Sequence, residues 1–206
     1  MSPIVGVLLS YVAGSIPSAY VAGKVRGVDL RKHGSGNLGA TNVVRVLGPK
    51  IGAVVFLADL LKGFLPVYFL PSYTHPLRPE LWGLVYGAAA ILGHVKPVFL
   101  LGKGGGKGVA TATGVFLAMA FRPMLVAEAV WIVVFYFTRY VSLASLMGAA
   151  VLPVAILAFS RDPQSPVFIA SVIIAAFVFW THRANIGRLR RGEEHRFVKK
   201  DGEGAP

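Results

Sequence analysis

The sequence predicts an all-α polytopic membrane protein with seven transmembrane helices and cytoplasmic glycine-rich loops. Hydrophobic residues make up 55% of the 206 residues and charged residues only 15%, whereas about a quarter of the residues in a soluble domain are charged. Several apolar runs approach the roughly 20 residues that cross a hydrocarbon core about 30 Å thick. The length corresponds to one domain. Residues 1–206 are therefore expected to form a single integral membrane domain, with a polar cytoplasmic tail over about 195–206.

The first apolar run is interpreted as a retained helix, because no basic segment precedes it and the later spans need an orientation. The fourth run is the weakest, since its 13 residues reach only about 20 Å at about 1.5 Å per residue. Either this span is tilted and completed by its neighbours, or the loop before it enters the membrane, where irregular backbone must be buried or face a wet cavity. The seven spans cover residues 3–23, 51–70, 81–101, 109–121, 123–138, 141–159 and 166–181.

The distribution of lysine and arginine predicts the orientation. With the N-terminus outside, 16 of these residues fall in the inner segments and three, Arg78, Arg122 and Arg161, in the outer ones. Membrane proteins carry such an excess of positive charge on the cytoplasmic side. The C-terminus and the polar loops are therefore expected in the cytoplasm.

Composition also excludes several classes of function. The formal net charge of +12 is explained by topology and by attraction to anionic lipid, at about 1 kcal/mol for each basic residue near the surface. The chain lacks the interleaved aromatic and basic residues of RNA-binding modules, so no nucleic acid partner is expected. It has no cysteine, which excludes a thiol nucleophile and thiolate metal sites. No carboxylates cluster for a metal, no cofactor is implied and no obligate protein partner is evident.

Three short polar segments interrupt the apolar sequence, at residues 34–45, 102–108 and 182–188, and they contain all three asparagines of the chain. Glycine-rich backbone with exposed amides, together with Asn, Lys and Arg, is suited to binding an anion such as a phosphate. Because the charge distribution places all three segments on one membrane face, we expect them to form one site.

The first segment formally matches a dinucleotide fingerprint, but no βαβ unit surrounds it and a membrane span follows. Its glycines let successive amides turn toward one point, and Arg45 offers a planar cation for bidentate phosphate contact. A tight turn before a helix is the alternative interpretation. The residues expected to bind substrate here are Ser35, Gly36, Asn37, Gly39, Thr41 and Asn42.

The second segment resembles a Walker A sequence, but Gly108 replaces the Ser or Thr that should follow Lys107. ATP hydrolysis is therefore not expected. Either the segment is a flexible linker, or the amides of Gly105 and Gly106 bind an anion together with Lys103 and Lys107.

In the third segment, helical spacing places His182 and Asn185 on one side, with Arg188 close by. His182 is suited either to proton transfer or to a neutral hydrogen bond with a phosphate oxygen. Ser142 begins the sixth span at the same depth, as a helix cap or as a phosphate ligand.

Ionisable residues inside the spans are costly unless they are paired. Asp59 and Lys62 are spaced for an internal ion pair in the second span. His94 lies near the inner end of the third span, and Glu128 in the fifth has no evident partner.

Taken in order along nearly the whole chain, these features resemble the bacterial acyl-phosphate glycerol-3-phosphate acyltransferases of the inner membrane (PlsY-type). Each motif is weak alone, and their order and common membrane face make the set specific. The motifs are Gly34–Arg45, Asp59-Leu-Leu-Lys-Gly63, Gly93–Phe99, Gly104–Thr111, Tyr140–Ser145 and His182–Leu189.

The resemblance implies transfer of a fatty acyl group from acyl phosphate to the sn-1 hydroxyl of glycerol 3-phosphate, giving lysophosphatidate and phosphate in phospholipid synthesis. It implies a multi-pass protein of the bacterial inner membrane, in contact with lipid and with a cytoplasmic active site. By motif, the catalytic residues are His182, Lys107 and Arg45. Ser35, Ser142 and Asn185 also bind phosphate, Asn37 and Thr41 shape the loop, and an extra Gly-Lys lets Lys103 share the role of Lys107.

No Asp or Glu is an evident base for the attacking hydroxyl, so either a substrate phosphate or His182 takes the proton. Two other functions fit the same residues. One is transport of a phosphorylated solute, which would use a cationic site at a helix break. The other is a lipid-binding scaffold. The clustering of charge on one face and the polar residues inside the spans argue against both.

Overall fold

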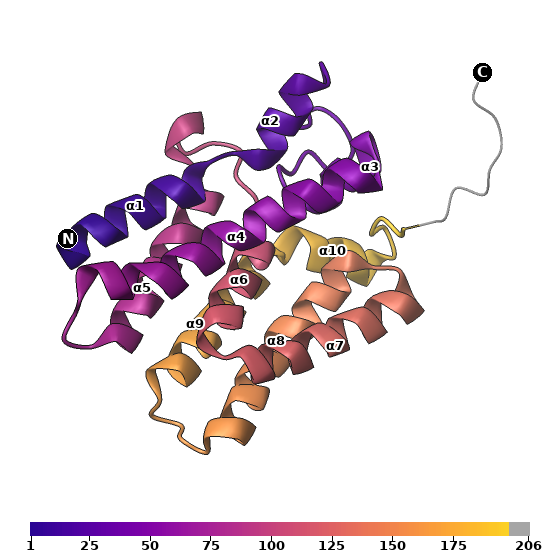
Figure 1. Cartoon of the computed structure of the whole chain (residues 1–206). Helices are drawn as coiled ribbons and strands as arrows, with labels where there is room; N and C mark the ends of the chain where they lie inside the picture. The colour runs from indigo at the N-terminus through magenta and orange to yellow at the C-terminus, as the bar shows by residue number, and fades with distance from the viewer. Residues whose placement is uncertain (198–206) are drawn as a thin grey trace, which may run out of the picture.

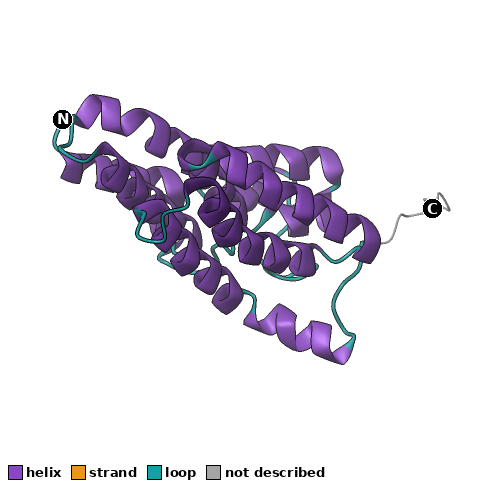
Figure 2. Cartoon of the chain, turned by 90° about the horizontal axis from the view of Figure 1, so that it is seen from below, coloured by secondary structure: helices purple, strands orange, loops and turns teal. Residues whose placement is uncertain are grey.

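The computed structural model describes residues 1–197, and every regular element within that range is helical (Figures 1 and 2). Figure 2 shows the helices joined by short loops, with no strand among the described residues. The elements are α1 (Pro3–Ser15), α2 (Ser18–Val25), α3 (Ala40–Leu47), α4 (Pro49–Thr74), α5 (Pro79–Val95), the 3₁₀ turn η1 (Val98–Leu100), α6 (Val109–Met119), α7 (Phe121–Thr138), α8 (Val141–Ser160), α9 (Pro166–Thr181) and α10 (Arg183–Arg191).

Five segments of the described chain are long and apolar enough to cross a membrane, and a sixth is added if α9 and α10 count as one bent span. The five are α1 with α2, α4, α5 with η1, α7 and α8. α6, where a fourth span was predicted, has only 11 residues. The prediction of an all-helical, multi-pass membrane protein is confirmed, and the number of spans by length and composition is five or six.

Local sequence sets several helix boundaries. Pro49, Pro79 and Pro166 stand at the first position of α4, α5 and α9, where the missing amide costs nothing and the fixed φ suits a helix. α7 and α8 end at Arg139 and Arg161, which adopt the left-handed conformation. Their amides bond to carbonyls in the preceding turn, which closes each helix before the next loop.

Glycines allow two pairs of helices to touch backbone to backbone. A Cβ at Gly63 of α4 would overlap the carbonyl oxygen of Thr111, and one at Gly114 of α6 would overlap that of Leu60. Gly93 of α5 meets the backbone of α1 in the same way. Small residues at such crossings let membrane helices pack by close van der Waals contact. α4 is therefore fixed against α6, and α5 against α1.

The N-terminus and the polar segments lie at opposite ends of α4 (Figure 1). The amino group of Met1 bonds to the carbonyl of Tyr73 at the end of α4, at 3.2 Å. α3 precedes the start of α4, and α2 and α10 lie toward the same end of the bundle (Figure 1). α4 is 26 residues long, which corresponds to about 39 Å, enough to separate two membrane faces.

Candidate active site

A cavity of about 530 Å³ lies where the three polar segments meet, between α3, α4, α6, α7, α8 and α10. The segments are far apart in sequence, yet each contributes side chains to its wall. The predicted residues that line it are Ser35, Asn37, Gly39, Thr41, Asn42, Arg45, Lys107, Ser142, His182 and Asn185. Gly36, Lys103, Gly105, Gly106 and Arg188 do not line it.

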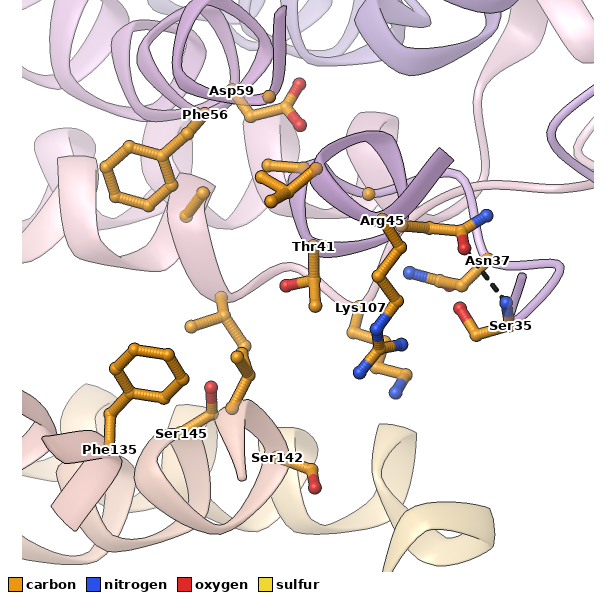
Figure 3. A pocket seen from close by; sticks show the side chains of 18 of the residues that line it. Ser35, Asn37, Thr41, Arg45, Phe56, Asp59, Lys107, Phe135, Ser142 and Ser145 are labelled. Carbon is orange, nitrogen blue, oxygen red and sulfur yellow. Dashed lines mark hydrogen bonds between the residues drawn. The ribbon is translucent and has the colours of Figure 1, made fainter. Parts of the chain in front are cut away.

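The cavity has a cationic side and an apolar side (Figure 3). The side chains of Arg45 and Lys107 point into the same space, and Ser142 lies on the wall that faces them (Figure 3). Phe56 and Phe135 lie away from the two cations (Figure 3). Further apolar lining comes from Val44, Ala53, Trp131 and Val141. The site therefore suits a molecule with an anionic head and a hydrocarbon tail.

The loop before α3 is built around the side chain of Asn42, which is 1% exposed. Its Oδ1 accepts a bond from the Ser35 amide at 2.9 Å, and its Nδ2 donates to the carbonyls of Leu30 and His33, both at 3.1 Å. Gly34 has a φ of +60°, and a Cβ there would overlap Oδ1. The Asn42 side chain thus stabilises the loop through both its carbonyl oxygen and its amino group.

Arg45 reaches the cavity because α3 is amphipathic, with Val43 fully buried in the core. The Arg45 Nη2 donates to the carbonyl of His195 at 3.3 Å, and the guanidinium lies 5.2 Å from the ring centre of Phe197. Burial lowers the pKa of Arg45, with Glu194 opposing the shift. Arginine nevertheless stays charged in proteins, so α3 presents a fixed positive charge.

The second loop is packed against the end of α5. The Gly106 amide donates to the His94 carbonyl at 3.2 Å. A Cβ at Gly105 would overlap the carbonyl oxygens of His94 and Val95. These glycines therefore let the backbone approach α5 closely, and the Gly106 amide is bonded within the protein. Lys103 is exposed and outside the cavity.

Lys107 follows these glycines and is the cation that the second loop contributes. Its Nζ donates to Oδ1 of Asn185. Burial lowers the pKa of Lys107 to about 8, opposed by the charge of Glu194 and assisted by those of Arg188 and Arg45. The ammonium therefore dominates at pH 7, but by a narrower margin than for an exposed lysine.

His182 lies just beyond the last residue of α9, where the chain bends by 58° into α10. Its Nδ1 is 2.8 Å from the Val178 carbonyl, and only a protonated Nδ1 can bond there. Burial, followed by the positive charge of Lys107, lowers the pKa of His182 to about 4. At pH 7 the ring is therefore neutral, and this tautomer leaves Nε2 as an acceptor.

Glu194 is a central residue of the site that the sequence analysis missed. Its buried carboxylate accepts bonds from Ser142 Oγ at 2.9 Å, Asn185 Nδ2 at 2.6 Å and Arg188 Nε at 2.7 Å. Burial alone would raise the pKa of Glu194, but these bonds outweigh it and the pKa is lowered. The carboxylate thereby fixes Asn185, which in turn accepts from Lys107. A signal was present, since Glu193 and Glu194 are the only acids in a strongly basic stretch.

After Glu194 the chain runs beside the cavity, and Phe197 lines it. The Phe197 amide donates to the Arg139 carbonyl at 3.0 Å, and its ring packs edge-on against Phe135 with centroids 5.8 Å apart. The guanidinium of Arg196 lies 5.0 Å from the ring centre of Tyr140. Within the expected polar tail, Phe197 thus lines the cavity and His195 bonds to Arg45, and 198–206 lie outside the described residues.

Polar residues also lie deeper in the cavity. Glu128, for which the sequence suggested no partner, accepts from Thr113 Oγ1 at 3.1 Å. Asp59 and His94 reach the wall from α4 and α5. Among residues 1–197 no group of three or more His, Cys, Asp or Glu is arranged to hold a metal ion.

The chain is similar to known proteins over most of its length. A family model described as glycerol-3-phosphate acyltransferase matches residues 4–192. A glycerol-3-phosphate acyltransferase of Trichlorobacter lovleyi is 47% identical over 188 residues, which cover 91% of this chain and 94% of that protein. The protein of the same name from Aquifex aeolicus is 44% identical over 192 residues, or 93% of this chain and 97% of that one.

Two crystal structures of PlsY (YgiH), an integral membrane glycerol 3-phosphate acyltransferase, have the same fold. The glycerol 3-phosphate form has a TM-score of 0.86 and 42% identity, over 95% of this chain and 96% of that one. The lysophosphatidic acid form has a TM-score of 0.84 and 40% identity, over 95% of each chain. The family resemblance found in the sequence is confirmed.

Proposed function

We propose that this chain, which belongs to the glycerol-3-phosphate acyltransferase family, takes its acyl group from an acyl phosphate and places it on the sn-1 hydroxyl of glycerol 3-phosphate. The chain is an integral membrane acyltransferase that acts on glycerol 3-phosphate. The donor and the acceptor hydroxyl are the proposed refinements. The cavity, with two cations at one side and hydrocarbon at the other, supports a donor with an anionic head and an acyl tail. The choice of acyl phosphate and of the sn-1 hydroxyl follows from the family resemblance.

Two anionic substrates repel each other, so an enzyme that joins them needs positive charge where their phosphates meet. Arg45 and Lys107 would supply that charge, with Ser35, Ser142 and Asn185 as further phosphate ligands. Asn37, Thr41 and Gly39 would shape the wall beside them.

The acyl chain would lie along the apolar wall between α4 and α7, where Phe56 and Phe135 face the cavity. Phe56 is also exposed at the surface of the bundle, so the acyl chain of the substrate can enter the cavity from lipid. An acyl phosphate carries its own leaving group. Binding and orientation of the two substrates then replace a covalent enzyme intermediate.

In the transfer step the sn-1 oxygen attacks the acyl carbonyl carbon, the carbonyl–phosphate C–O bond breaks, and inorganic phosphate leaves with the bonding electrons. The hydroxyl proton passes either to a substrate phosphate or to His182. The tautomer of His182, with Nδ1–H bonded to Val178, supports a role for Nε2 as an acceptor from a substrate hydroxyl.

We further propose seven membrane segments in the bacterial inner membrane, with the short α6 completed by its neighbours. The N-terminus would face outside, and the active site and C-terminus the cytoplasm. The position of Met1 at the opposite end of α4 from the polar segments, with basic residues concentrated around the site, supports this orientation.

The donor is tested with purified protein in lipid, by release of phosphate from palmitoyl phosphate. We expect release that depends on glycerol 3-phosphate, with palmitoyl-CoA inactive as donor. Lys107→Ala and Arg45→Ala should each lower kcat/KM by about a hundredfold, because each removes a charge-assisted phosphate contact worth about 3 kcal/mol. No release by the wild-type protein, or near-normal turnover in either variant, would overturn the proposal.

The role of His182 is tested by His182→Gln. If Nε2 takes the proton, kcat falls by about a hundredfold or more with little change in KM for glycerol 3-phosphate. A loss confined to KM would instead make His182 a binding residue and leave the substrate phosphate as the base.

A further inference from the structure

Three ionisable side chains meet inside the helical bundle, outside the group of residues assigned above to the phosphates. Lys62 Nζ donates to Asp59 Oδ1 at 2.5 Å, and His94 Nδ1 lies 3.7 Å from the same oxygen. The side chains of all three are 7% exposed or less. The first two belong to α4 and His94 to α5.

Such a cluster is costly, and stability alone does not account for it. Moving charged groups from water into a bundle costs several kcal/mol for each ion, and apolar side chains of similar volume would often pack at least as well. We therefore ask which neighbouring parts of the protein the Asp59, Lys62 and His94 side chains hold in place.

The cluster is in direct contact with the loop that carries Lys107. The imidazole of His94 packs against Gly106, where a Cβ would overlap Nε2. The His94 carbonyl accepts the Gly106 amide at 3.2 Å. Asp59, Lys62 and His94 also line a small void together with Gly104, Gly105 and Gly106. The ring position of His94 therefore decides where the residue before Lys107 lies.

The same stretch of α4 also fixes the far end of the loop. Gly63 follows Lys62 directly and meets the carbonyl of Thr111 in the first turn of α6. One turn further along α6, Gly114 meets the carbonyl of Leu60. The loop thus enters from α5 and leaves into α6, and residues 59–63 contact both elements.

We infer that Asp59, Lys62 and His94 form a positioning cluster that sets the place of Lys107 in the phosphate site by holding His94 against Gly106. The inference rests on the proposed role of Lys107 as a phosphate ligand. The three residues are positioning residues, since they act through the loop. A misplacement of about 1 Å at a reacting group costs up to a hundredfold in rate, so a small shift of the loop would be measurable.

Binding of glycerol 3-phosphate to the full-length protein in lipid nanodiscs, without acyl donor, tests the inference. Lys107→Ala should weaken binding more than tenfold, and His94→Ala should weaken it about tenfold. If His94 acts through Lys107, the double variant binds no more weakly than Lys107→Ala alone. Losses that multiply, or wild-type binding by His94→Ala, would overturn the inference.

A second variant changes the contact between His94 and Gly106 on the loop side and leaves Asp59, Lys62 and His94 unaltered. Gly106→Ala should also weaken binding about tenfold and should lose that effect in the Lys107→Ala background. Wild-type affinity in Gly106→Ala would count against the inference even if His94→Ala failed to fold. Gly83→Ala, also on α5 but facing the flexible side chain of Met119, is the matched control and should bind normally.

Tyr86→Phe is the control for a general loss of buried polar contacts. It removes a hydrogen bond between Tyr86 and Thr74 on the same helix as His94, and it should leave binding unchanged. The proposed function fails separately: absence of phosphate release from palmitoyl phosphate, with the binding cycle still coupled, refutes the donor and leaves the cluster's role intact. Lys107→Ala that binds like wild type refutes the premise itself.

Discussion

The two glycine-rich loops each deliver one cation to the same cavity, but they are held in different ways. Residues 34–45 wrap around the side chain of Asn42, which lies in the same segment. Residues 102–108 have no such internal brace among the described bonds and lie against the backbone and imidazole at the end of α5. The first loop is held by one of its own side chains, whereas the second has no side chain where Gly105 and Gly106 lie against α5.

This difference determines what should damage each loop. The first loses its shape when a side chain is removed, because backbone groups that Asn42 satisfied are left without partners. The second loses its shape when a side chain is added, because the space next to α5 is already filled. Removal of the Asn42 side chain from the first loop and addition of a Cβ to Gly105 or Gly106 in the second should therefore have the same result, loss of phosphate binding.

The largest effect is expected from Gly105→Ala in the second loop. The new Cβ would overlap the carbonyl oxygens of His94 and Val95, and backbone at a helix end cannot move aside as a flexible side chain can. We expect kcat/KM for glycerol 3-phosphate to fall by at least about a hundredfold, since Lys107 is displaced. Steady-state kinetics with the protein in lipid measures this.

Gly187→Ala provides the control for that substitution. Its Cβ would meet only the end of the Arg191 side chain, so activity should stay within about twofold of wild type. An active Gly105→Ala enzyme would show that the second loop tolerates side chains and that the contrast between the loops is wrong.

A smaller effect is expected from Asn42→Ala in the first loop. The substitution removes three hydrogen bonds, each worth about 1 kcal/mol. kcat/KM should fall by about 10- to 100-fold and the unfolding temperature should fall with it. Asn42→Asp should not rescue, because a carboxylate oxygen would face the carbonyls of Leu30 and His33. Lost activity with an unchanged unfolding temperature would make Asn42 a direct substrate ligand and not a brace.

The contrast also explains what the sequence could predict. Apolar runs gave the spans closely: 166–181 coincides with α9 and 123–138 falls within α7, because membrane solvation acts on each segment separately. The position of the first loop could also be predicted from the sequence, because its hydrogen-bond donors and Asn42 lie within one short segment. The amide of Asn42 was expected to bind substrate, however, and in the structure it bonds to Ser35, Leu30 and His33.

Residues whose role depends on distant packing could not be predicted. The contact of His94 with Gly106 requires the crossing of α4, α5 and α6, which no local pattern encodes. Glu194 lies beyond the end of α10, after Gly192, where no apolar period assigns it a face. Lys62 and Asp59 were paired correctly from their spacing, whereas their link to the second loop is visible only in three dimensions.

The smallest expected effect is a fall in kcat/KM with rising pH, which distinguishes the cation of the second loop from that of the first. Arg45 keeps its charge throughout the accessible range, whereas the pKa of Lys107 is lowered to about 8, mainly by burial. Because an anion binds the protonated ammonium, kcat/KM for glycerol 3-phosphate should fall about twofold between pH 7 and 8 and about tenfold by pH 9. Lys107→Arg should move this decline out of the range. Glu194→Gln should move it to lower pH, since the charge of Glu194 raises the pKa of Lys107. A decline that stays in place in Lys107→Arg would assign it to another group and leave the second loop's charge independent of pH.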